Sequence, residues 1–152
     1  MGLLTEAKQN QNLYSPAFGL KINGRNAPVE IRNAVGGIKV EEKIDVGARF
    51  TLTVKAALNP GDGRYPVLDH PLFNPGNRVV LEMGYGSNLE PVMTGSIAIL
   101  EPEFRPGKPP VMTVQGQDIS YSVLKKKTPG ESYIKQTYSQ IVERIARKAG
   151  LI

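Results

Sequence analysis

The sequence of 152 residues contains no cysteine, and this absence excludes several kinds of chemistry. A disulfide framework cannot form, and thiolate metal sites and cysteine nucleophiles are ruled out. No stretch approaches the roughly 20 apolar residues that span a bilayer. Residues 1–6 lack the charged and long apolar regions of a signal peptide. We therefore expect no membrane anchoring in this chain.

The composition indicates a globular protein with a basic surface. Hydrophobic residues make up 40% and charged residues 22% of the chain, which places it outside the disordered and membrane-embedded classes. The 12 prolines and 16 glycines favour many short strands and turns over a helical bundle. The net charge of +5 is spread along the chain, apart from Lys125–Lys127 and the C-terminal helix, which favours an ordinary basic surface over a nucleic-acid site.

Alternating side chains predict a series of short strands. The clearest lies within residues 48–56, where Phe50, Leu52 and Val54 share one face and polar side chains share the other. Similar alternation predicts strands within residues 14–22, 29–32, 37–45, 78–85, 92–100 and 110–117. The strand within 92–100 should place Met93, Gly95, Ile97 and Ile99 on one face. Asn23-Gly24 predicts a tight hairpin turn before the strand at 29–32.

Residues 59–77 form a long predicted loop with four prolines and three glycines and no periodicity. Loops of this length usually make contacts outside the domain. Asp62, Asp69 and His70 lie in this loop, but their spacing matches no known metal site. We therefore expect these side chains to cap turns.

Helical patterns begin after the last predicted strand. Asp118 can cap a short helix at 119–124. Thr137 and Gln140 have the spacing of a capping box, and an apolar stripe follows at Ile141, Val142, Ile145, Ala146 and Ala149. Gly150 then ends the helix. The fold class predicted from these patterns is mainly β with a C-terminal α-helix, a small antiparallel barrel or sandwich of six to eight short strands.

The glycines around Tyr85 predict a turn and not a phosphate site. Gly84 and Gly86 match two positions of a dinucleotide fingerprint, but Leu89 occupies the third and a strand follows where a helix would be needed. The chain has no P-loop sequence. His70 is the only histidine, and the adjacent Glu41 and Glu42 point to opposite faces of a strand, so nothing favours catalysis. We expect no enzymatic activity, no metal and no cofactor.

The second half of the chain resembles a known family. The resemblance is carried by four stretches, FNPGNRVVLEMGYG, VMTGSIAILEPEF, PPVMTVQGQDISYSVLKKK and YIKQTYSQIVERIARKAGL. In this order and spacing they resemble the N-terminal part of phage late control protein D, the VgrG spike proteins and the related baseplate hubs of contractile injection systems. The residues that match the family pattern are Gly84, Tyr85, Thr94, Gly95, Ile97, Gly116, Asp118, Thr137, Ile141, Ile145 and Gly150.

The resemblance implies a tail-tube-like β-barrel that serves as a structural baseplate or tail hub component. Such a ring joins the tail tube to the central spike, so the implied partners are sister copies in a homotrimer or hexamer, the tube protein, the spike protein and baseplate proteins. The implied location is a virion tail or injection-system particle assembled from protein made in the bacterial cytoplasm. The organisation expected is an arm at 1–13, the barrel domain at 14–127, and a linker and helix at 128–152. The chain ends near the point where the family begins its second half, which is expected of a fragment of a longer hub or of a single-barrel relative.

Two other functions compete with this one. An OB-like barrel could bind single-stranded nucleic acid, since a small basic β-barrel is a suitable scaffold. Base stacking needs exposed aromatic side chains, however, and Phe18 and Phe50 lie on the apolar faces of their strands. A small hydrolase has less support, because the serines have no histidine at an interpretable position.

Overall fold

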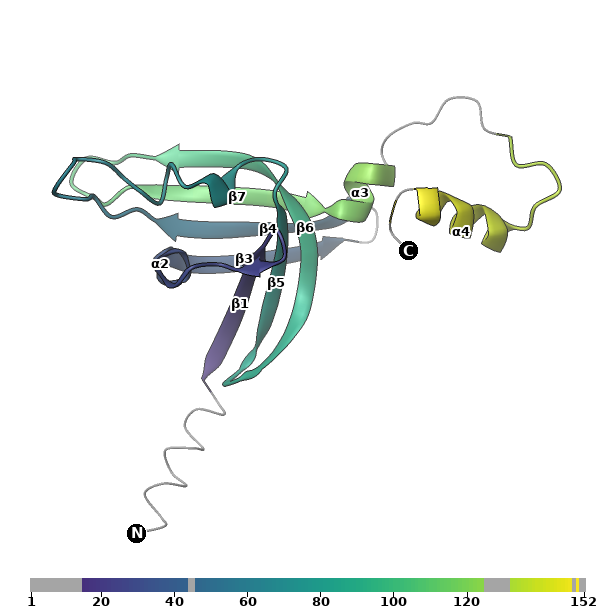
Figure 1. Ribbon diagram of the computed structural model, residues 1–152, viewed down its shortest axis with the longest axis horizontal. Coiled ribbons are helices and arrows are strands. Elements are labelled where there is room, and N and C mark those ends of the chain that lie inside the picture. The colour runs from purple at the N-terminus through teal and green to yellow at the C-terminus, as the bar shows by residue number, and fades with distance from the viewer. Residues whose placement is uncertain (1–14, 44–45, 125–131, 149, 151–152) are drawn as a thin grey trace, which may run out of the picture.

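The computed structural model describes residues 15–43, 46–124, 132–148 and 150, which form one antiparallel sheet and a few helical segments (Figure 1). The strands are β1 (Pro16–Ile22), β2 (Arg25–Asn26), β3 (Val35–Lys43), β4 (Val46–Lys55), β5 (Arg78–Tyr85), β6 (Asn88–Glu103) and β7 (Val111–Asp118). The helical segments are α2 (Val29–Ala34), the 3₁₀ turn η1 (Pro71–Phe73), α3 (Ile119–Leu124) and α4 (Tyr138–Lys148). The prediction of a mainly β fold with a C-terminal helix is confirmed. The predicted arm at 1–13 and Lys125–Lys127 lie outside the described residues.

The seven strands follow the order β2-β1-β5-β6-β7-β4-β3. Every pairing between neighbouring strands is antiparallel. Strand β6 is the longest, with 16 residues. Its first part pairs with β5 and its last part pairs with β7, so it belongs to both halves of the sheet. Figure 1 shows β1 and β5 running across the direction of β7, β4 and β3.

Two bulges bend β6 and change which side chains face inward. The register with β5 skips Val92, and the register with β7 skips Ala98. An unpaired residue in one strand bends it and increases its twist. Met93, Gly95 and Ile97 are buried as predicted, but Ile99 is 48% exposed, and Leu100 packs against the core instead. The prediction for Ile99 is wrong because strict alternation cannot continue through the bulge at Ala98.

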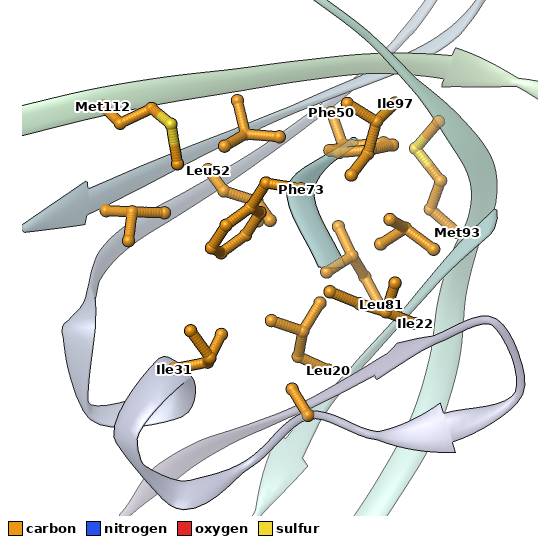
Figure 2. Packing of buried hydrophobic residues seen from close by; sticks show 14 residues of the cluster. Leu20, Ile22, Ile31, Phe50, Leu52, Phe73, Leu81, Met93, Ile97 and Met112 are labelled. Carbon is orange, nitrogen blue, oxygen red and sulfur yellow. The ribbon is translucent and has the colours of Figure 1, made fainter. Parts of the chain in front are cut away.

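The hydrophobic core lies between the two halves of the bent sheet (Figure 2). Phe50, Leu52 and Val54 of β4 are each at most 1% exposed, which confirms the predicted inward face of this strand. Strands β1, β5, β6 and β7 add further aliphatic side chains, and Figure 2 shows Phe73 of η1 among them. Alternating patterns on several strands therefore converge on one core.

The segment after β1 departs from the prediction. Asn23 and Gly24 form the expected turn, with φ angles of 51° and 78°. The returning strand β2, however, has only two residues, and residues 29–34 form helix α2. Pro28 precedes this helix, and its carbonyl oxygen accepts a hydrogen bond from Arg32 N at 3.0 Å. The predicted strand at 29–32 is therefore wrong, because the chain turns into a helix after Pro28.

The short β2 also bears on the prediction of a closed barrel. Strand β1 has a β2 partner only at Lys21 and Ile22, and Leu20 O accepts a hydrogen bond from Ala27 N at 2.8 Å, so residues 16–19 have no strand partner on that side within the described chain. At the other end of the sheet β3 pairs with β4 alone. The sheet is consequently strongly bent but open, and the predicted closure is not present in this single chain. Helix α2 occupies the place of the return strand predicted at residues 29–32.

The long loop between β4 and β5 is ordered by its own turns. Asn59 and Arg64 form an isolated bridge, Asp62 Oδ1 accepts a hydrogen bond from Arg64 N at 3.0 Å, and His70 Nδ1 accepts one from Leu72 N at 3.2 Å. These contacts confirm turn capping by Asp62 and His70. The loop returns to the sheet where Asn23 Oδ1 accepts a hydrogen bond from Arg78 N at 3.0 Å.

None of the described helices is both long and apolar enough to cross a membrane.

Candidate assembly interface

The two ends of the sheet leave backbone groups without strand partners. We call Pro16–Gly19 the β1 margin, because β2 pairs with the last two residues of β1 and Leu20 O accepts a hydrogen bond from Ala27 N. We call Val35–Lys43 the β3 margin, because β4 is the neighbour on one side only. In the part of the chain that the structure describes, no pairing joins the two margins. Unpaired strand edges are ready templates for pairing with another chain.

An apolar groove separates the two margins. Its volume is about 550 Å³, and none of its lining residues carries a charge. The lining comes from β1, the start of β3 and the end of β5: Pro16, Ala17, Phe18, Val35, Gly36, Gly37, Ile38, Met83, Gly84 and Tyr85. Phe18 and Ile38 also pack against the core, so the groove is an open side of the hydrophobic interior. We call it the seam groove.

Gly36 and Gly37 leave part of the β3 wall of the seam groove without side chains. A Cβ atom on Gly37 would meet nothing nearer than 3.8 Å, and one on Gly36 would meet the flexible Lys55 side chain at 2.9 Å from its Cε. Packing within the chain therefore does not require glycine at position 37. A backbone without side chains allows another backbone to approach closely.

Charged pairs lie on the strands of both margins. On β1, Lys21 Nζ lies 2.5 Å from Glu82 Oε1 of β5, and Glu82 is the more buried partner. On β3, Lys39 Nζ lies 3.0 Å from Glu41 Oε1, and the hydrogen bond and charge of Lys39 lower the pKa of Glu41 below its ordinary value. Charged side chains on an edge strand limit unspecific sheet extension. The β3 margin thus carries charges that restrict its partner, whereas the charged pair of β1 lies just beyond the β1 margin, at a residue that β2 covers.

The first group of motif residues lies on the central strands. Gly84 and Tyr85 end β5, and Tyr85 is 59% exposed. The turn after them is confirmed by Gly86, whose φ is 59° and whose N–H donates to Ser15 O at 3.1 Å. A Cβ atom on Gly84 would overlap the carbonyl group of Asn88 on β6. Glycine at position 84 is therefore required by the close approach of the hairpin backbone.

Thr94, Gly95 and Ile97 lie together on β6, next to Gly116 and Asp118 on β7. Gly95 pairs with Asp118 and Ile97 pairs with Gly116. The structure therefore brings these five motif residues together in neighbouring strands. Asp118 Oδ1 also accepts hydrogen bonds from the backbone N–H and the hydroxyl of Ser120, which confirms its predicted role as a cap of α3.

The remaining motif residues belong to α4. Gln140 N donates to Thr137 Oγ1 at 3.4 Å, and Thr137 N donates to Gln140 Oε1 at 2.9 Å, so the predicted capping box is present. Ile141 and Ile145 are half-buried, and Gly150 has the positive φ of 68° expected of a residue that ends a helix. No residue of α4 is fully buried. Ala149 of the predicted stripe lies outside the described residues.

The candidate metal-binding side chains of the long loop lie in the described part of the chain, where Asp62 and His70 serve local turns. Among residues 15–43, 46–124, 132–148 and 150, no three metal-binding side chains form a group. His70 uses Nδ1 to cap its turn, and Asp62 caps another turn of the same loop. The sequence patterns missed the seam groove, because its walls come from β1, β3 and β5, which lie far apart in the chain. The only signal for it was the uncharged Gly36-Gly37 pair at the start of a predicted strand.

Comparisons with known proteins show which family and which solved structures this chain is similar to. A family model described as the Alg8 N-terminal domain matches residues 15–152. No curated protein matches the chain significantly. Among solved structures, the 43 kDa tail protein of prophage MuSo2 from Shewanella oneidensis has a TM-score of 0.66 and 20% identity, over 90% of this chain and 38% of that one. The tail protein from Neisseria meningitidis MC58 has a TM-score of 0.59 and 13% identity, over 89% of this chain and 34% of that one.

The structural likeness confirms the resemblance to phage tail proteins at the level of the fold. The matched part is less than two fifths of the length of either tail protein. Because the family model covers the chain from the first described residue onward, the chain belongs to the Alg8 N-terminal domain family.

Proposed function

We propose that this chain is a non-enzymatic structural component of a phage-type tail or a related contractile injection system. The observation that carries the proposal is an open sheet with two unpaired margins and an apolar groove between them, in a fold shared with two tail proteins. A sheet of this kind gains backbone hydrogen bonds and buries apolar surface when a neighbouring copy extends it.

The margins differ from one another, which favours a ring over a simple dimer. If the β1 margin of one copy meets the β3 margin of the next, the contact is head-to-tail, and it gives a closed ring when the rotation between copies closes. In such a ring the bent sheet would gain the closure that the single chain lacks. The tail-tube-like barrel is therefore proposed as a property of the assembly.

The finer role proposed is that of a baseplate or tail hub, a ring that joins the tail tube to the central spike. Its partners would then be sister copies with threefold or sixfold symmetry, the tube protein, the spike protein and baseplate proteins. The particle would form from protein made in the bacterial cytoplasm. Support comes from the motif residues of the hub resemblance, which the fold brings together on β5, β6 and β7.

Electron microscopy of the purified chain tests this function. We expect closed rings or short stacks whose class averages show threefold or sixfold symmetry. A monomer that persists at all protein concentrations and salt concentrations would contradict the proposal. The competing function, binding of single-stranded nucleic acid, predicts a salt-dependent mobility shift with single-stranded DNA. That result is disfavoured by the inward position of Phe50 and by the packing of Phe18 against the core.

A further inference from the structure

A second groove lies at one end of the sheet and adjoins the seam groove, since Ala34 lines this groove and the next residue, Val35, lines the seam groove. Its volume is about 730 Å³. Figure 1 shows α2, the connection after β4 and the β6–β7 turn at this same end. They supply the lining residues Glu30, Asn33, Ala34, Lys55, Ala56, Ala57, Leu58, Tyr65, Val67, Lys108, Pro109 and Pro110. We call it the end groove.

Large apolar side chains are exposed at this end. Leu58 lines the end groove and is 51% exposed. Tyr65, another lining residue, makes an edge-to-face contact with Phe104, their ring centroids 5.9 Å apart, and Phe104 is 61% exposed. Exposed apolar clusters with a polar rim mark sites of protein interaction. The long loop at 59–77, for which external contacts were predicted, supplies one wall of this groove.

The backbone of the groove walls indicates what kind of segment fits. Pro109 and Pro110 have no N–H, and Pro110 O already accepts a hydrogen bond from Ala56 N at 2.9 Å. Helix α2 supplies another part of the lining, and there Arg32 N already donates to Pro28 O and Val35 N to Arg32 O. An incoming strand would therefore find few backbone partners here, in contrast to the seam groove. The end groove is suited to side chains presented by a helix.

The charges around the groove restrict the partner further. Lys55 and Lys108 both line it, and neither forms an ion pair with another described residue. Glu30 is the single carboxylate in the lining. Cations beside an apolar surface favour a partner whose apolar side chains are flanked by carboxylates.

From these observations we propose that the end groove binds an acidic amphipathic helix of a partner protein. The apolar face of that helix would cover Leu58 and Tyr65, and its carboxylates would pair with Lys55 and Lys108. The end groove shares no lining residue with the seam groove, so the two proposed contacts are made by different residues.

The test uses two labelled, stapled helical peptides that share one leucine face and differ only in carrying Glu or Lys beside it. Fluorescence anisotropy with the full chain should show tighter binding of the Glu peptide by roughly tenfold, a preference that salt weakens. The Lys55→Glu/Lys108→Glu variant should reverse the preference. Leu58→Asp should abolish binding of both peptides while circular dichroism stays unchanged.

A matched control changes the net charge of the protein by the same amount, at residues outside the end groove. Lys39→Glu/Lys43→Glu alters two exposed lysines of the β3 margin and should leave the preference for the Glu peptide in place. The proposal is overturned if neither peptide binds, if the two peptides bind equally, or if the control variant reverses the preference as well. The last result would assign the effect to the overall charge of the protein.

Discussion

The ring of Phe50 on β4 covers the backbone of Gly116 on β7, its direct partner in the strand register. A Cβ atom on Gly116 would overlap ring atoms Cε1 and Cζ of Phe50, and it would stand 2.5 Å from Ser96 O. The same ring lies 3.1 Å from the position of a Cβ on Gly95. Gly116 thus makes room for one buried aromatic side chain, whereas at Gly95 the nearest atom to an added Cβ is Gln117 O of β7, at 2.5 Å.

Gly116→Ala should therefore destabilise the fold. The added methyl group has no space beside the ring or the Ser96 carbonyl, and overpacking of this kind costs about 3 kcal/mol. Urea unfolding followed by circular dichroism measures the change. Combining it with Phe50→Leu should recover part of the loss, with a coupling energy of about 1 kcal/mol or more.

Gly37→Ala is the matched control for this prediction. It places the same methyl group in a strand where nothing lies nearer than 3.8 Å, so the free energy of unfolding should change by less than about 0.5 kcal/mol. Equal losses in the two variants would mean that strand glycines matter for reasons other than the Phe50 ring.

Ile97 and Ile99 should respond differently to truncation, because the bulge at Ala98 separates them. Ile97 is 2% exposed, and Ile97→Ala should cost about 3 kcal/mol. Ile99 is 48% exposed, and Ile99→Ala should cost less than about 1 kcal/mol. Chemical denaturation of both variants checks the difference. Similar costs at the two positions would show that β6 alternates without the bulge.

Asp118→Ala should weaken the junction between β7 and α3. Its carboxylate accepts the backbone N–H of Ser120 at 2.6 Å, and loss of such a cap costs about 1 kcal/mol. Asp118→Asn keeps an acceptor oxygen and should retain most of this stability. A loss as large in Asp118→Asn as in Asp118→Ala would argue against the capping role.

Thr137→Ala should loosen α4 without changing the stability of the sheet. The variant removes the oxygen that accepts Gln140 N, and the helix should lose about 1 kcal/mol against local opening. Hydrogen exchange of the α4 amides should then accelerate while the amides of β4 stay protected. Ser139→Ala, on the exposed first turn, is the control and should leave both exchange rates unchanged.

Local patterns predicted most strands, because every strand except the two-residue β2 has one face in the core or packed against it. The alternation of Phe50, Leu52 and Val54 is of this kind, and so is the Asn23-Gly24 turn, whose residues both adopt positive φ. The capping box at Thr137 is also local, since both of its hydrogen bonds lie within four residues.

The errors in the prediction come from effects that alternation does not contain. Val29 and Ile31 alternate with charged residues like a strand, yet Pro28 starts a helix there and only Ile31 is buried. The bulge at Ala98 reverses the faces of β6 from one residue to the next. The seam groove depends on how the bent sheet brings β1, β3 and β5 together, which no single segment of the sequence specifies.

Disulfide trapping across the margins tests the central claim most directly, and the absence of cysteine from the chain gives it a clean background. A single-cysteine variant at Ala17 of the β1 margin is mixed with variants at Lys39 or Glu41 of the β3 margin that carry a mass tag, so that only crosslinks between copies are counted. A disulfide requires Cα atoms within about 7 Å of each other. We predict that at least one β1–β3 combination crosslinks efficiently. We predict that Ala98→Cys, on the central strand β6, does not crosslink efficiently when it is mixed with the same tagged β3 variants. Crosslinking of every β1–β3 combination no higher than the Ala98→Cys level would contradict the claim that the open ends of this sheet join neighbouring copies.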